Sequence, residues 1–338
     1  MFSEADLDAA VQAGVLTPAT ATAFRDFVAR GHAAPSVDEE HFRLLSGFND
    51  IFVSIATALL LTALGWLGGR IGVWAGGAAV AAASWALAEY FTRQRRMALP
   101  SILLLLAFVS SVIVGIGGLL TPAASDWHGG HDWEAAVCLA AGTAAAWLHW
   151  RRFRVPITVA AGAAAALFTL MVLVATALPQ GSVTLTPLVF IAGLGMFALA
   201  MWWDGSDRLR VTRRADVAFW LHLAAAPLIV HPTFGMLGLL GRGTPDLANA
   251  AIAVLLYLVL AVIALAVDRR ALLVSALAYV LYAISSLLRG AGSVSYALAL
   301  AALVIGCGLL LLSALWQRAR RDTVRALPHG LQVFLPPV

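Results

Sequence analysis

The chain has 338 residues, of which 61% are hydrophobic and 12% charged, with a mean hydropathy of +0.88 and a formal net charge of +4. Soluble globular proteins carry about twice that share of charged residues, so the composition excludes an ordinary soluble protein. The chain contains no lysine, which excludes Schiff-base chemistry on a lysine amine and with it a retinal protein or a pyridoxal-phosphate enzyme.

The first 47 residues predict a small helical head and not a targeting peptide, because they carry scattered acidic residues and lack a continuous apolar core. Ser3 begins a first short helix that Gly14 ends. Thr17 is the N-cap of a second helix that reaches Arg30. A third start at Ser36 predicts a helix that lies along the membrane surface.

Ten apolar segments follow, each long enough for a membrane crossing of about 20 residues. The arginine clusters all fall on one side of this zigzag, and loops with excess arginine face the cytoplasm. By this assignment 19 arginines lie inside and three outside, which places both termini on the cytoplasmic side of a bacterial inner membrane. The predicted crossings are Phe48–Leu67, Ile71–Phe91, Ala98–Leu120, Glu134–Trp150, Val155–Leu178, Pro187–Trp203, Ala215–Gly235, Leu247–Val267, Ala271–Leu288 and Ser293–Trp316.

The predicted fold is therefore an all-α polytopic membrane bundle of about ten helices, arranged as five hairpins. It divides into the cytoplasmic head at 1–47, the membrane domain at 48–317 and a cytoplasmic tail at 318–338. Proline residues in that tail predict an irregular or membrane-lying end. The odd-numbered crossings start at intervals of roughly 50 to 60 residues, which indicates a weak internal repeat.

Most ionisable residues of the predicted crossings lie near the cytoplasmic ends. A helix cap or a nearby arginine is the simplest partner for such a group, and we expect those roles for them. The group comprises Asp50, Glu89, His149, Asp204, Asp216 and Asp268.

The seventh crossing is the exception, because His222 lies about 10 Å past its inner end by helical rise. Pro227 removes one helix hydrogen bond and frees the carbonyl of Leu223, and Pro232 has the same effect near the outer end. Broken helices with unpaired carbonyls often form substrate sites in transporters. The alternative, weighted equally, is a kinked helix with one satisfied histidine. The predicted substrate site comprises His222, Leu223, Pro227, His231 and Asp216.

The loop from Asp126 to Glu134 gathers two histidines and three carboxylates, a set that suits a divalent metal of borderline softness. The candidate ligands are His128, His131 and Asp132, but no regular element holds them, and a solvated loop is the favoured interpretation. The chain has no motif for catalysis or nucleotide binding, so we expect neither an enzyme nor a cofactor. The arginines are spread among loop ends without interleaved aromatic residues, which argues against a nucleic-acid partner.

The stretch from Leu7 to Thr17, LDAAVQAGVLT, lies ahead of serial hairpins. With this stretch ahead of its hairpins, the chain resembles uncharacterised bacterial inner-membrane proteins that are grouped under domains of unknown function. Those proteins join a short cytoplasmic helical head to many crossings. The resemblance implies an inner-membrane location and no particular activity. The ten-crossing layout is also similar to that of the drug/metabolite exporters and of the tellurite-resistance/anion-channel fold, although the chain has the signature residues of neither.

Two function classes follow from these observations. The first is a transporter or channel for a small solute, with its site near the seventh crossing. The second is a non-transporting membrane scaffold or sensor whose head, residues 1–47, binds a protein partner. Membrane lipids are the partner expected in either case.

Overall fold

The computed structural model describes residues 4–24, 48–120, 132–177, 185–207, 210, 212–237, 247–270, 273, 276–277, 280–281, 297–332 and 335. The chain divides into two compact units, Met1–Leu44 and Leu45–Val338. This division falls close to the boundary predicted at residue 47. Within the described ranges all regular structure is helical, which agrees with the predicted all-α class.

The head unit contains the first predicted short helix and the start of the second, whose predicted end at Arg30 lies outside the described residues. Helix α1 spans Glu4–Gln12, and Gly14 follows it with a φ of 69°, the left-handed conformation that ends many helices. Residues 18–24 are also helical, and the Oγ1 of Thr17 accepts a hydrogen bond from the backbone N–H of Thr20 at 3.2 Å. This contact confirms Thr17 as the N-cap. The third predicted start, at Ser36, lies outside the described residues.

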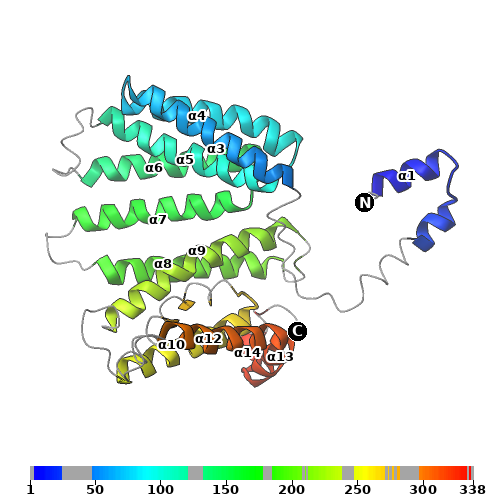
Figure 1. The fold of residues 1–338 in the computed structure, drawn as a ribbon, viewed down its shortest axis with the longest axis vertical. Coiled ribbons are helices and arrows are strands. Elements are labelled where there is room, and N and C mark those ends of the chain that lie inside the picture. The colour runs from blue at the N-terminus through cyan, green and yellow to red at the C-terminus, as the bar shows by residue number, and fades with distance from the viewer. Residues whose placement is uncertain are drawn as a thin grey trace. The chain divides into compact units, whose positions relative to one another are not determined.

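The second unit is a series of long helices (Figure 1). Five of those described are long and apolar enough to cross a membrane: α3, α5, α7, α8 and α9. The helices are α3 (Phe48–Gly69), α4 (Val73–Ala88), the π-helical η1 (Glu89–Gln94), α5 (Ala98–Leu120), α6 (Asp132–Phe153), α7 (Ile157–Ala177), α8 (Leu185–Gly205), α9 (Arg213–Met236), α10 (Leu247–Val267), α12 (Ala297–Ala314), α13 (Trp316–Ala326) and α14 (His329–Gln332).

The described part of the chain thus supports fewer crossings than the ten predicted. The count rises to six if α12 and α13, which are bent by 76°, are taken as one span. Helix α4 has only 16 residues before the helix widens into η1, and α6 carries charged residues at both ends. The ninth predicted crossing, Ala271–Leu288, is described at only a few of its positions. The count of about ten is therefore not supported by these helices alone.

Helices adjacent in the sequence also pack against each other. The closest-packed pairs are α4 with α5, α6 with α7 and α8 with α9. A turn containing a left-handed residue joins each pair: Arg96, Arg154 and Arg210 have φ values of 52°, 55° and 54°. Asp268, which follows α10, has a φ of 59°. Because each non-glycine residue in this conformation costs about 1–2 kcal/mol, its recurrence marks a specific turn geometry.

These four turns lie 58, 56 and 58 residues apart, which matches the interval of the predicted repeat. What repeats is thus a turn with one left-handed residue, which recurs at the same end of the helices. We call the end that carries these four turns the arginine end.

Glycine residues set the closest helix contacts. A Cβ atom at Gly77 of α4 would lie 2.5 Å from the Cα of Gly115 in α5, and one at Gly76 would lie 2.8 Å from the carbonyl oxygen of Gly65 in α3. Helix α4 is therefore held between two neighbours at a distance that excludes any side chain, as small-residue packing in membranes allows.

The predicted tail was an irregular or a membrane-lying end, and its first part, residues 318–326, is helical and so not irregular. Helix α13 follows α12 after a 76° bend, packs against α10 and continues to Ala326. Trp316, Arg320 and Val324 form its buried face, and their spacing of four residues places them on one side of the helix.

Candidate functional site

The predicted site residues of α9 lie on different sides of that helix. The helix continues from Arg213 to Met236 through both prolines. His222 is fully buried, Leu223 and Asp216 are half-buried, and Pro227 and His231 are exposed. At about 100° per residue, Pro227 and His231 lie about 140° and 180° around the axis from His222. The structure therefore does not bring His222 and His231 together, and α9 is not broken into two half-helices.

The carbonyl that Pro232 frees is covered by α8. Pro232 removes the helix donor to Leu228, and a Cβ at Gly193 of α8 would lie 2.7 Å from the Leu228 carbonyl carbon. Gly193 thus lets α8 approach the unpaired carbonyl directly. This carbonyl faces a neighbouring backbone, a different environment from the cavity expected of a substrate site.

The buried side of α9 contains a polar network that the sequence analysis did not predict as a unit. His222 Nε2 lies 2.9 Å from Oδ2 of Asp204, which is in the last turn of α8. Arg269, which follows α10, donates from Nη2 to Oδ1 of the same carboxylate at 2.5 Å and from Nε to Oδ2 at 3.3 Å. The side chains of His222, Asp204 and Arg269 are 0%, 2% and 3% exposed. We call these three residues the buried triad.

The triad connects three helices. Arg269 also donates from Nη2 to the carbonyl oxygen of Ala215, at the start of α9, at 3.1 Å. The ring of Phe197 in α8 packs edge-on against His222, with 5.2 Å between ring centroids. The Nδ1 atom of His222 is buried and has no hydrogen-bond partner within the described ranges. A buried nitrogen without a partner is costly, and such groups call for an explanation.

Asp268, next to Arg269, is the centre of a second set of contacts. Arg210 donates from Nη1 to Oδ2 of Asp268 at 2.8 Å and from Nη2 to the carbonyl oxygen of Val267 at 3.0 Å, which caps the end of α10. Trp316 Nε1 donates to Oδ1 of Asp268 at 2.8 Å, and Arg320 Nε lies 3.6 Å from the same oxygen. Burial, and then the nearby charge of Arg269, lowers the pKa of Arg210, and Asp268 opposes this shift.

These contacts agree with the expectation that carboxylates near the crossing ends pair with arginine. Glu89 of η1 also pairs, with Arg152 at the end of α6 at 2.6 Å. The sequence analysis missed the burial of the triad and the position of Arg269, which lies 65 residues after Asp204. The position of Arg269 could have indicated this contact, because an arginine directly after an apolar helix can reach a carboxylate at the end of a neighbouring helix.

A second buried histidine lies between α6 and α7. Nδ1 of His149 is 3.4 Å from Oγ1 of Thr158, and Nε2 is buried with no hydrogen-bond partner within the described ranges. The ring packs against Phe153, with 4.6 Å between centroids. Among the described residues no charged group pairs with His149, so its setting differs from that of His222.

The predicted metal loop is largely outside the described residues. His128 and His131 belong to that part, and Asp132 is the first residue of α6. Within the described ranges no group of three or more His, Cys, Asp or Glu residues is arranged to hold a metal ion.

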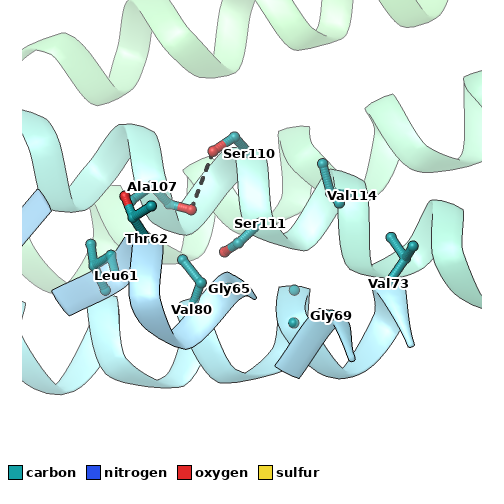
Figure 2. A pocket seen from close by; sticks show the side chains of 12 residues that line it. Leu61, Thr62, Gly65, Gly69, Val73, Val80, Ala107, Ser110, Ser111 and Val114 are labelled. Atoms are coloured by element: carbon teal, nitrogen blue, oxygen red, sulfur yellow. Dashed lines mark hydrogen bonds between the residues drawn. The ribbon is translucent and has the colours of Figure 1, made fainter. Parts of the chain in front are cut away.

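A groove of about 410 Å³ lies between α3, α4 and α5. It is lined mainly by glycine and aliphatic residues, and Ser110 on its wall turns its hydroxyl back to the carbonyl of Ala107 in its own helix (Figure 2). The groove therefore offers apolar surface and no free polar group from Ser110. None of its lining residues belongs to the buried triad.

The chain has no match to compare it with. No protein-family model, no curated protein and no solved structure matches it. The function is therefore argued from the residues and their geometry alone.

Proposed function

We propose that the protein is a transporter of a small solute in a bacterial inner membrane, and that the buried triad closes its arginine end. The observation that supports this most strongly is the triad itself. Ionisable side chains inside a membrane protein are expensive and usually mark ion or substrate pathways. Here three of them from α8, α9 and the end of α10 share one sealed space.

The charge balance of the triad supplies a mechanism. The charges of Asp204 and Arg269 cancel when His222 is neutral, and a proton on His222 leaves one net positive charge. An uncompensated charge in a space closed to water is strongly unfavourable. Protonation therefore favours a conformation in which the contacts between α8, α9 and Arg269 separate and water enters. In this proposal His222 is the group that couples a proton to the opening of the arginine end.

The proposed topology has ten crossings with both termini in the cytoplasm. It is supported by the arginine distribution along the sequence. Reporter fusions at Asp126, Gly181 and Gly243 should report the periplasm, and fusions at Gln94, Arg152 and Asp207 the cytoplasm. One site with the opposite accessibility removes a pair of crossings.

The transport proposal is tested with purified protein in liposomes that contain a trapped pH-sensitive dye. Small anionic, cationic and zwitterionic solutes are added in turn, with and without a pH gradient. His222→Gln can still pair with Asp204 but cannot carry a proton, so its solute movement should no longer depend on the gradient. Glu89→Gln, at the exposed ion pair, is the control and should behave as the unmodified protein.

Two results contradict the proposal. The first is a solute flux whose pH dependence is the same in His222→Gln and in the unmodified protein. The second is the absence of flux for every solute class, with the protein shown to be folded in the liposomes. The second result favours the alternative, a membrane scaffold or sensor whose head binds a protein partner. The separation of Met1–Leu44 as its own unit is the observation that supports this alternative.

A further inference from the structure

Helix α13 has the position and shape of a helix that lies on a membrane surface. It follows α12, an apolar helix whose exposed side chains include Leu310 and Leu311. The 76° bend between the two means that α13 runs nearly parallel to the membrane plane if α12 crosses the bilayer along its normal (Figure 1). Membrane-surface helices of this kind have one packed face and one polar, basic face.

The packed face of α13 is fixed to the rest of the second unit. Trp316 and Arg320 contact Asp268 beside the end of α10, as described above. The guanidinium of Arg270 lies over the Trp316 ring, 4.8 Å from its centroid. The orientation of α13 about its own axis is therefore set by these contacts, and so is the direction of its opposite face.

That opposite face carries three arginines and one carboxylate, Asp322, which is also exposed, so its net charge is +2. Arg318, Arg321 and Arg325 are exposed, and their spacing of three and four residues places them on one side of the helix. By helical rotation their mean direction is about 130° from that of the packed residues. No hydrogen bond or ion pair to a carboxylate is recorded for any of the three within the described part of the chain.

We propose that this face of α13 binds the head groups of anionic phospholipids. The three guanidinium groups are opposite in charge to these head groups, and in the proposed topology α13 lies at the depth of the head groups. Arginine forms paired hydrogen bonds with phosphate oxygens. Basic residues on a surface helix are a recognised basis for anionic-lipid binding. The proposal rests on the proposed topology, in which α12 crosses the membrane, and it does not rest on transport.

The test measures the binding of fluorescent phosphatidylglycerol to the full-length protein in neutral detergent, by fluorescence anisotropy. The double variant R318Q/R325Q should bind it about 10- to 30-fold more weakly, from two lost basic contacts. The matched control is R213Q/R214Q, which removes two exposed arginines at the start of α9, on the same arginine end. It should bind as the unmodified protein does.

The source of the ligand is tested by competition. Unlabelled phosphatidylglycerol should displace the probe, whereas phosphatidylcholine and inorganic phosphate should not. A third variant, R318K/R325K, keeps the positive charges but not the paired hydrogen bonds of arginine, so it should bind more tightly than R318Q/R325Q and more weakly than the unmodified protein. The proposal is overturned if both double glutamine variants weaken binding equally, since the attraction is then diffuse. It is also overturned if R318Q/R325Q has no effect, if R318K/R325K binds as weakly as R318Q/R325Q, or if phosphatidylcholine or phosphate competes equally well.

Discussion

Replacing Asp204 with alanine should destabilise the protein far more than the equivalent change at an exposed ion pair. The substitution removes both carboxylate contacts of the Arg269 guanidinium, whose side chain is 3% exposed, and the partner of His222 Nε2. Breaking a buried pair on one side costs about 3–5 kcal/mol. That is a large part of the roughly 5–15 kcal/mol that keeps most proteins folded.

The protein supplies its own control, because Glu89 and Arg152 form a pair of the same chemical type. Their side chains are 31% and 42% exposed, and water screens them. Exposed pairs contribute about 0.2–1 kcal/mol, so Glu89→Ala should have a small effect. The two variants therefore compare one interaction at two levels of burial.

The measurement is the midpoint temperature of unfolding in detergent, followed by tryptophan fluorescence. Asp204→Ala should lower it by on the order of 10 °C and Glu89→Ala by at most about 2 °C. The double variant Asp204→Leu/Arg269→Met should recover much of the loss, because apolar side chains then fill the space that the unpaired charge occupied. Equal shifts for Asp204→Ala and Glu89→Ala would show that the triad is not sealed from water, and the reasoning would fail.

Two further predictions are measured on the same preparation, and a third is measured by expression in cells. Gly193→Ala should lower the free energy of unfolding by about 1–3 kcal/mol, because its Cβ would lie 2.7 Å from the Leu228 carbonyl carbon. The control Gly195→Ala, with nothing within 4 Å, should be neutral or slightly stabilising, and equal unfolding midpoints for the two variants would contradict the close approach of α8 and α9. Trp316→Phe removes the hydrogen-bond donor to Asp268 and should lower the free energy of unfolding by about 1.5–3 kcal/mol. An unchanged unfolding midpoint would mean that this hydrogen bond does not hold α13 in place. Deletion of residues 1–44, which form a separate unit, should leave membrane insertion and accumulation at the level of the full chain; failure to accumulate would show that the head is integral to the bundle.

Several helix bounds follow from the sequence alone. The predicted segments Ala98–Leu120 and Leu247–Val267 are identical to α5 and α10, and Phe48–Leu67 differs from α3 by two residues at its end. These bounds are local properties, because a long apolar run forms a helix in a membrane and charged or turn-forming residues end it. The helix stop at Gly14 and the N-cap at Thr17 could also be predicted, because they too depend only on neighbouring residues.

The substrate site predicted on α9 shows where local reasoning stops. One of the two alternatives given to the prolines was a broken helix, but α9 continues through them, and Gly193 brings α8 against the carbonyl of Leu228. A proline removes a hydrogen bond in any helix, whereas the effect on helix shape depends on what packs beside it. That neighbour cannot be read from the sequence of α9.

The sequence by itself determined that the chain is helical and apolar, where several of its helices begin and end, and that arginine gathers at one end of them. The tertiary structure decided which of those arginines meets which carboxylate. Asp204 and His222 are 18 residues apart and Arg269 lies 65 residues beyond Asp204, so their contact depends on the register of three packed helices. That register is set by close contacts such as Gly193 against Leu228, which arise only when the helices pack together.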